Sequence, residues 1–120
     1  LLGLSFKSDT DDLRESPMVE VAQHLIGRGF ELGIYDPQLN LAKLIGTNKR
    51  VIDEKMPHLA SLLTDDLAAA LGQSGLVIAA QKCVDLDTLR PLITAEHILL
   101  DVNGWPELRD LPGRYEGFCW

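Results

Sequence analysis

The chain has 120 residues, of which 46% are hydrophobic and 24% are charged, as is typical of one globular domain. Eleven basic residues against 18 acidic ones give a net charge of −7, which disfavours nonspecific binding to nucleic acid. No apolar run approaches the roughly 20 residues of a membrane-spanning helix, and two cysteines are too few for a disulfide framework. We therefore expect a cytoplasmic protein that binds neither nucleic acid nor membrane.

The beginning of the chain predicts a strand, a polar loop and a helix. Residues 1–4 are apolar, which is typical of a buried parallel strand. Ser16 and Pro17 predict a helix start, with the serine side chain as the cap and the proline in the first turn. The loop between them carries Lys7 and Arg14. Because ligands of open α/β sheets bind at the carboxyl ends of strands, we expect these two cations to face an anionic ligand.

The rest of the chain alternates between predicted strands and helices. In chain order the pattern predicts a strand at residues 30–35, a short helix and a surface excursion within 38–60, and strands at 61–64, 75–80, 97–102 and 115–120. Helices are predicted at residues 67–71 and 86–93. Asp65 or Asp66 can cap the first of these helices, and Pro91 interrupts the second. This alternation predicts an α/β fold with a doubly wound, mostly parallel sheet and helices on both faces.

The expected sheet is Rossmann-like but lacks the G-x-G-x-x-G fingerprint. Gly3 is the only glycine before the first helix, whereas a dinucleotide loop uses three glycines. This argues that the domain does not cradle NAD. Asp36 follows a predicted strand, where a ribose-binding acid is found in dinucleotide domains, but Asp36-Pro37 is more typical of a turn. We favour the turn.

The run of residues 3–17, which reads GLSFKSDTDDLRESP, resembles a signature of the UDP-glucose/GDP-mannose dehydrogenase family. In that family the signature opens the C-terminal nucleotide-binding domain. The stretches at residues 34–37 and 99–101 agree more loosely, so the resemblance covers essentially all 120 residues. It implies that residues 1–120 are the C-terminal nucleotide-sugar-binding domain of a longer dehydrogenase chain. The start of the chain inside a predicted strand, without a methionine, is consistent with this interpretation.

The resemblance also implies a chemistry and two site residues. The family oxidises the C6 alcohol of a nucleotide sugar to a carboxylate in two hydride transfers, with NAD as cofactor and a cysteine nucleophile, and its members are homo-oligomers. Lys7 would contact the nucleotide-sugar substrate, and Arg14 would reach NAD bound to the preceding domain. A structural ion pair of Arg14 with Asp11 or Asp12 is the alternative. The catalytic residues would lie outside this chain, which should be inactive alone.

Other reactive side chains have simpler interpretations. Cys83 lacks the glycine-rich surroundings of the family's nucleophile, and we interpret it as an ordinary loop cysteine. The three histidines, His24, His58 and His97, lack metal-ligand spacing, so we expect no metal site.

The end of the late strand bears on the substrate. UDP-specific members usually show Asp-Gly-Arg or Asp-Ala-Arg there, whereas this chain has Asp101-Val102-Asn103. This departure and the wording of the signature favour GDP-mannose, oxidised to the GDP-mannuronate precursor of alginate, with a UDP sugar as the alternative. Trp105 could pack in the core or line a base pocket. A receiver-like signalling domain is a more remote alternative, since Asp65 follows a predicted strand but no lysine follows the late one.

Overall fold

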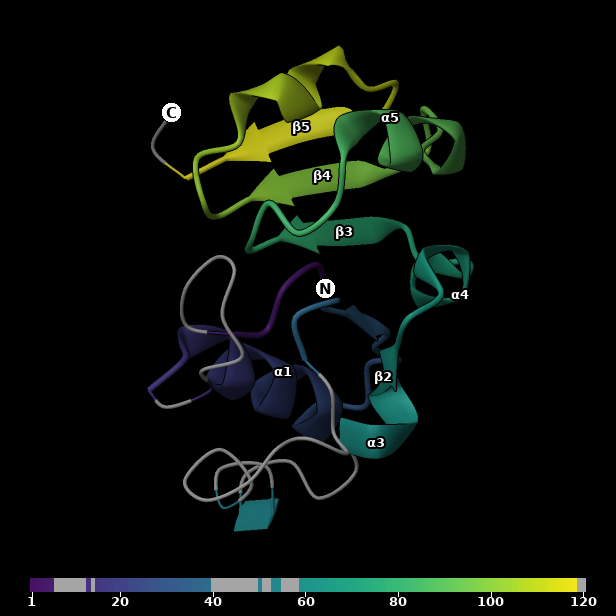
Figure 1. Cartoon of the computed structure of the whole chain (residues 1–120). Helices are drawn as coiled ribbons and strands as arrows, with labels where there is room; N and C mark the ends of the chain where they lie inside the picture. Colours follow the sequence, from purple (N-terminus) through teal and green to yellow (C-terminus); the bar gives the residue numbers. More distant parts are fainter. Residues whose placement is uncertain (6–12, 14, 40–49, 51–52, 55–58, 119–120) are drawn as a thin grey trace.

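The structure is a computed structural model that describes residues 1–5, 13, 15–39, 50, 53–54 and 59–118. Within these residues the strands are β1 (Ile34–Tyr35), β2 (Leu63–Thr64), β3 (Leu76–Ala79), β4 (Ile98–Asp101) and β5 (Arg114–Gly117), as Figure 1 shows. All five strands predicted after residue 29 are found, each shorter than predicted. Of the short helix expected at residues 39–45, only Leu39 is described, and it is not helical.

The N-terminal segment, residues 1–4, lies at the centre of the sheet. Leu2 forms parallel bridges with Tyr35 on one side and Ala79 on the other. β1 pairs in parallel with β2, and β4 pairs in parallel with both β3 and β5. The order is therefore β2, β1, the N-terminal segment, β3, β4 and β5 (Figure 1). Starting from the N-terminal segment, the chain adds β1 and β2 on one side of it and then β3, β4 and β5 on the other side. A topological switch point therefore lies between Leu2 and β3.

The N-terminal segment is not the full strand that its apolar sequence predicts. Gly3 has a φ of 89°, which is outside the β region. The amides of Leu4 and Ser5 then turn to the side chain of Asp36 instead of to a neighbouring strand. The regular pairing therefore stops at residue 3.

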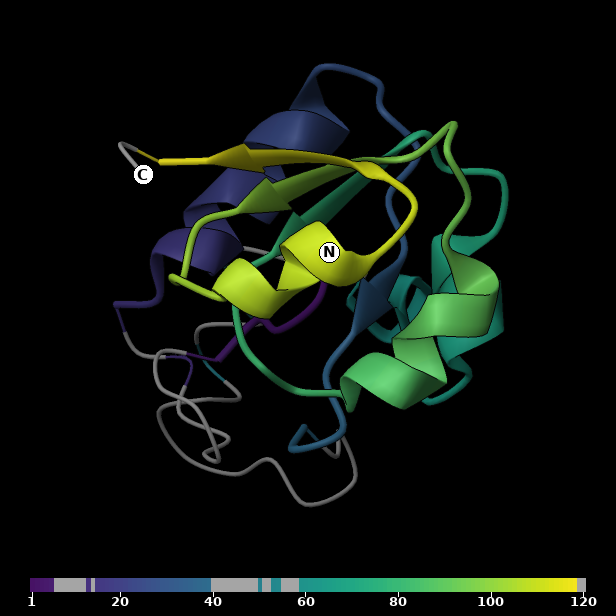
Figure 2. The same ribbon diagram turned by 90° about the horizontal axis from the view of Figure 1, so that it is seen from above.

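Different helices cover the two faces of the sheet. α1 (Pro17–Gly27) packs on one face, where Val19 and Ala22 are buried. α4 (Leu67–Leu71), α5 (Leu86–Leu89) and the 3₁₀ helix η3 (Pro106–Asp110) cover the other face (Figure 2). Along β3, Ile78 belongs to the core beneath α1, whereas Val77 and Ala79 belong to the opposite core. Because strand side chains alternate between faces, this confirms the doubly wound parallel architecture.

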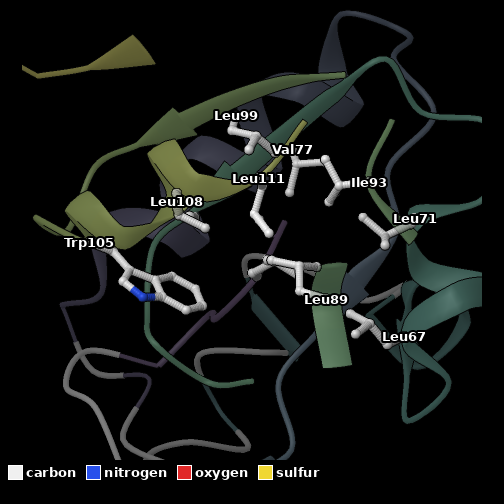
Figure 3. Close-up of a cluster of buried hydrophobic side chains, with 11 residues drawn as sticks. Leu67, Leu71, Val77, Leu89, Ile93, Leu99, Trp105, Leu108 and Leu111 are labelled. Carbon is white, nitrogen blue, oxygen red and sulfur yellow. The ribbon is translucent and has the colours of Figure 1, made fainter. Parts of the chain in front are cut away.

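The larger core lies beneath α4, α5 and η3. Figure 3 shows its side chains: Leu67, Leu71, Val77, Leu89, Ile93, Leu99, Trp105, Leu108 and Leu111. Trp105 is only 5% exposed within this cluster. The structure thus gives Trp105 a packing role and removes it as a wall of a base pocket.

Helix starts and stops follow the sequence closely, with one correction. α4 has the predicted bounds, and the Asp66 Oδ1 atom caps it by accepting from the amide of Ala69 at 3.2 Å. The predicted helix at residues 86–93 is divided near Pro91 into α5 and the 3₁₀ helix η2 (Arg90–Leu92). The predicted side-chain cap at Ser16 is wrong. Its hydroxyl donates to the Leu4 carbonyl at 2.6 Å, because that carbonyl lies in the buried region where sheet pairing stops.

The short helix α3 (Leu59–Leu62) leads directly into β2, so the strand predicted from residue 61 begins two residues later. Among the described helices, none has both the length and the hydropathy to span a bilayer.

Candidate functional site

A cleft of about 350 Å³ opens at the switch point of the sheet. Its walls come from the residues that follow three neighbouring strand positions: Ser5, Asp36, and the loop that starts at Gln81. Lys82, Cys83 and Thr88 complete the part of the wall that β3 and α5 contribute. The carboxyl edge at a switch point is where open α/β sheets bind ligands, so the cleft is the candidate site.

Asp36 is buried at the edge of this cleft, with 4% of its surface exposed. Its Oδ2 atom accepts hydrogen bonds from the amides of Leu4 at 2.8 Å and Ser5 at 3.1 Å, and from the Ser5 hydroxyl at 3.2 Å. Its Oδ1 atom accepts from the amide of Gln38 at 3.0 Å. The amide of Leu39 donates to the Asp36 carbonyl at 3.1 Å, which closes a β-turn. The predicted turn is confirmed, and the carboxylate faces the protein instead of a ribose.

Gly3 and Gln81 lie at the end of the first strand position, where the pyrophosphate of a dinucleotide would approach the backbone. A Cβ atom on Gly3 would lie 2.5 Å from the Cβ atom of Gln81, so only glycine fits. The Nε2 atom of Gln81 donates to the Ser5 carbonyl at 3.3 Å across the switch point. The side chain therefore occupies the space above the first strand position, and these residues do not fit the pyrophosphate of a dinucleotide.

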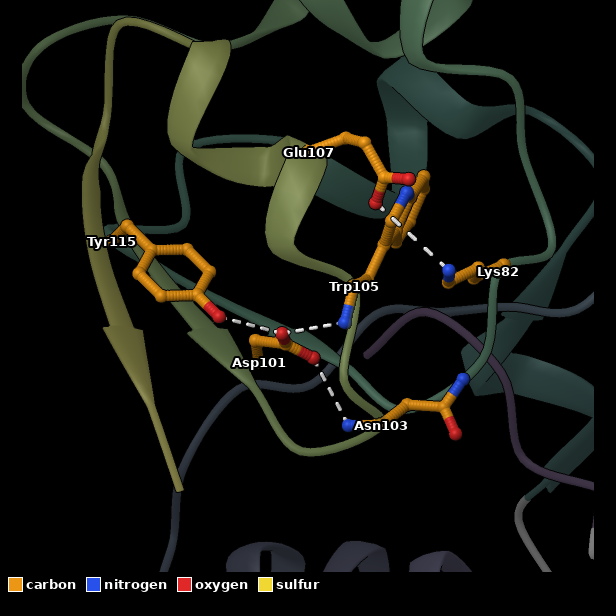
Figure 4. A network of polar contacts seen from close by, with 6 residues as sticks. All are labelled: Lys82, Asp101, Asn103, Trp105, Glu107 and Tyr115. Atoms are coloured by element: carbon orange, nitrogen blue, oxygen red, sulfur yellow. Dashed lines mark hydrogen bonds and ion pairs between the residues drawn. The ribbon is translucent and has the colours of Figure 1, made fainter. Parts of the chain in front are cut away.

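A second polar cluster holds the turn after β4 (Figure 4). Asp101 has no exposed surface, and its Oδ2 atom accepts from the amide of Trp105 at 2.6 Å and the hydroxyl of Tyr115 at 2.7 Å. Its Oδ1 atom accepts from the amide of Asn103 at 3.0 Å. The Asn103 side chain extends away from this carboxylate and is exposed, so it is available to a ligand at the strand ends (Figure 4).

Lys82 lies beside this turn, at the end of the neighbouring strand β3. Its Nζ atom is 3.9 Å from the Oε2 atom of Glu107, and the two side chains are 46% and 55% exposed. A pair this long and this exposed stabilises by at most about 1 kcal/mol. The ammonium group is therefore held only loosely.

Cys83 is half-buried, and its environment suppresses its reactivity. The thiol donates to the Tyr35 carbonyl at 3.8 Å. Burial raises the pKa of Cys83 to about 12, and the nearby Asp36 carboxylate adds to this increase. A thiol that stays protonated is a poor nucleophile, which agrees with the interpretation of Cys83 as an ordinary loop cysteine.

This predicts slow alkylation of Cys83. In a Cys119→Ser variant, Cys83 is the remaining thiol. We expect its reaction with iodoacetamide at pH 8 to be about a thousandfold slower than that of free cysteine, because so little thiolate is present. The rate should rise with pH until the pKa of about 12 is approached. The same variant unfolded in urea is the control and should react at the ordinary rate, whereas rapid alkylation of the folded protein would contradict the prediction.

The two cations predicted to bind ligand, Lys7 and Arg14, lie outside the described residues, as do Asp11 and Asp12. Ser5 and Ser16 are described residues on either side of this stretch of sequence. Ser5 lines the cleft, and Ser16 is hydrogen-bonded to the N-terminal segment. In the described part of the chain, no group of three or more His, Cys, Asp or Glu side chains could hold a metal.

Sequence reasoning missed the roles of Asp36 and Asp101 as anchors. Each follows the last apolar or aromatic residue of a strand and precedes a turn, and each accepts the backbone amides of that turn. An acid at a strand end followed by a turn is the signal that could have identified them. Gln81 carries no comparable signal.

Residues 1–110 match the UDP-glucose/GDP-mannose dehydrogenase family, UDP binding domain. The chain belongs to this family. It is 42% identical over 123 residues to GDP-mannose 6-dehydrogenase of Pseudomonas aeruginosa, a match that covers 100% of the chain and 27% of that protein. It is 30% identical over 98 residues to UDP-glucose 6-dehydrogenase of Bos taurus, covering 77% of the chain and 18% of the relative.

A crystal structure of a ternary complex of GDP-mannose dehydrogenase from Pseudomonas aeruginosa superposes with a TM-score of 0.72 at 39% identity. The match covers 99% of the chain and 27% of that structure. The resemblance found in the sequence is thus confirmed for the family and for the fold. The chain spans about a quarter of the length of the GDP-mannose 6-dehydrogenases that it matches.

Proposed function

We propose that this chain is the C-terminal, nucleotide-sugar-binding domain of an NAD-dependent 6-dehydrogenase that oxidises GDP-mannose to GDP-mannuronate, the alginate precursor. The observation that supports GDP-mannose is the difference between the two groups of relatives. GDP-mannose 6-dehydrogenases match the whole chain at about 40% identity, whereas the bovine UDP-glucose enzyme matches 77% of it at 30%. The enzyme would act in the cytoplasm as a homo-oligomer.

In this proposal the domain supplies positioning and charge. Lys7 follows the cleft residue Ser5 by two positions in the sequence, and its ammonium would bind phosphate or sugar oxygens of the substrate. Arg14 lies two residues before Ser16 and would reach NAD held by the preceding domain. Asn103, exposed at the end of β4, would lie near the base.

NAD, when bound, accepts the hydride that leaves C6 of the sugar. The switch point of this domain does not fit NAD, since Gln81 fills the approach to Gly3 and Asp36 is turned inward. The domains that bind NAD and carry the cysteine nucleophile would therefore precede this one in the same polypeptide. What the present residues would do is hold the nucleotide end of the substrate and exclude water from the cleft.

The test is NADH formation by the full-length polypeptide with GDP-mannose and with UDP-glucose. We expect a higher kcat/KM with GDP-mannose, and no NADH formation by the 120 residues alone, which should bind GDP only weakly because most of the contact surface is absent. Asn103→Arg, which restores the UDP-type pattern, should shift the preference toward UDP-glucose, and Asn103→Gln is the matched control of similar polarity. A higher kcat/KM with UDP-glucose in the unmodified enzyme would support the UDP-sugar alternative.

Family membership decides against the receiver-like alternative. A receiver domain would need Asp65 as the phosphorylated residue. The neighbouring Asp66 has a structural role, as the N-cap of α4.

A further inference from the structure

We propose that Lys82 is a further substrate-binding residue of the switch-point cleft, and that its ammonium group exchanges Glu107 for the phosphate groups of the nucleotide sugar. This inference rests on the proposed function and deepens it, since it concerns the same cleft. Four features of the molecule support it: the charges along the cleft, the contacts that hold the loop around Lys82, the weakness of its ion pair, and its place between two neighbouring strand ends.

Lys82 is the basic side chain among the described residues that line the cleft, and the acidic ones are Asp36 and Asp85. The Asp36 carboxylate faces inward, where backbone amides and a hydroxyl donate to it. The whole chain has a net charge of −7, which repels a diphosphate. A diphosphate in this cleft therefore needs a cation at the wall, and within the described lining Lys82 supplies it.

The loop that carries Lys82 is held on both sides of this residue. Before it, the Nε2 atom of Gln81 donates to the Ser5 carbonyl at 3.3 Å. After it, the Cys83 thiol donates to the Tyr35 carbonyl at 3.8 Å. The contacts of its neighbours thus fix the backbone of Lys82 at the switch point, whereas its own side chain is 46% exposed. A flexible ammonium on a fixed backbone can adapt to the oxygens of a phosphate group.

The ion pair between Lys82 and Glu107 is easily exchanged. Glu107 reaches the ammonium from η3, the helix that follows β4 (Figure 4). The Nζ and Oε2 atoms are 3.9 Å apart, which is longer than the roughly 2.7–2.9 Å of a charge-assisted hydrogen bond. A phosphate oxygen in direct contact binds an ammonium more strongly than this distant, exposed carboxylate does. The ammonium is therefore kept at the wall of the cleft and remains available to a substrate.

Lys82 also lies between the two strand ends that the proposed function assigns to the substrate. Ala79 at the end of β3 pairs with Asp101 at the end of β4, so Lys82 and Asn103 both lie just beyond the same paired position. On its other side, β3 adjoins the N-terminal segment, which ends at Ser5. A nucleotide sugar with its base near Asn103 and its sugar toward Ser5 places the diphosphate at the end of β3, because the diphosphate joins base and sugar ends.

The test is steady-state kinetics of the full-length polypeptide with Lys82→Gln, using whichever of GDP-mannose and UDP-glucose has the higher kcat/KM. We expect the KM for the nucleotide sugar to rise about tenfold, the effect of losing one charge-assisted contact, while kcat changes less than the KM. The KM of the variant should also depend less steeply on NaCl concentration than that of the unmodified enzyme, because one charge no longer takes part. Lys82→Arg, which keeps the charge, should lower the KM again.

Arg114→Gln is the matched control. Arg114 is also an exposed cation paired with a glutamate, since its Nε atom is 2.8 Å from the Oε1 atom of Glu116. It begins β5, so it lies at the edge of the sheet opposite the cleft. Its substitution should leave the KM unchanged. Glu107→Gln should not raise the KM either, because Lys82 keeps its charge and loses only a competitor for it.

An unchanged KM with Lys82→Gln, or an equal rise with Arg114→Gln, would overturn the inference. A rise with Glu107→Gln would also overturn it, because the ion pair itself would then be what the enzyme needs. Lys82 is exposed, so the melting temperature should stay unchanged in its variants. An unmodified enzyme that oxidises no nucleotide sugar would instead contradict the proposed function. Calorimetric titration with GDP then still tests Lys82, and equal Kd values with and without Lys82→Gln would overturn its role.

Discussion

Replacing Asp101 with alanine is expected to lower the free energy of unfolding by about 3–5 kcal/mol. The substitution leaves the amides of Asn103 and Trp105 and the hydroxyl of Tyr115 without the acceptor that they share. The Trp105 amide is buried and the other two donors are partly buried. A buried donor that loses its partner costs about 1–3 kcal/mol. Equilibrium urea unfolding of the 120-residue chain, followed by far-UV circular dichroism, measures the loss.

Tyr115→Phe is the matched control for this prediction. It removes the hydroxyl that donates to Asp101 at 2.7 Å but keeps the ring, over which the guanidinium of Arg109 lies at 4.6 Å from the centroid. We expect it to cost about 1 kcal/mol, since Asp101 keeps its backbone donors. If Asp101→Ala costs no more than Tyr115→Phe, the carboxylate does not organise the turn after β4.

Lys7→Ala is expected to raise the KM of the full-length enzyme for its nucleotide sugar by about 10- to 150-fold, which corresponds to about 1.5–3 kcal/mol for one charge-assisted hydrogen bond. The melting temperature should change little, because a loop lysine contributes little to a core. Initial-rate kinetics and a thermal melt on the same preparation separate the two effects. A variant with unchanged KM and kcat would remove Lys7 from the site.

Arg14→Ala is the comparison that separates the two cations. If Arg14 serves the cofactor side, its removal should raise the KM for NAD more than the KM for the nucleotide sugar. Arg14→Lys should restore the activity only partly, because an ammonium does not replace a planar guanidinium. Equal damage to both KM values with a large fall in melting temperature would favour the ion pair with Asp11 or Asp12.

Much of the fold could be predicted because its signals are local. The apolar runs of β3 and β4 indicate strands buried on both faces, and the structure confirms both. The bounds of α4 follow from its composition and from the acid that precedes it, Asp66. The family could be recognised because residues 3–17 form a long ordered pattern.

The roles that sequence reasoning missed depend on distant partners. Ser16 looks like a helix cap when only its neighbours are considered, yet its hydroxyl bonds to Leu4, 12 residues earlier. Asp36 and Leu4 are 32 residues apart, and Gln81 and Ser5 are 76 apart. A polar side chain that has both a local and a distant partner within reach takes the one that a buried backbone group requires. Local pattern alone does not contain that requirement.

The central place of the N-terminal segment also constrains the order in which the domain assembles. β3, β4 and β5 follow one another along the chain and pair with their nearest neighbours, so this half of the sheet closes only short loops. Leu2, by contrast, joins this half to β1 through partners 33 and 77 residues away, since 35 − 2 = 33 and 79 − 2 = 77. Closing long loops costs chain entropy before the contacts repay it. The segment at residues 1–5 thus has strand partners farther away in the sequence than any other pairing in this sheet, and the switch-point cleft exists only once that segment is in place.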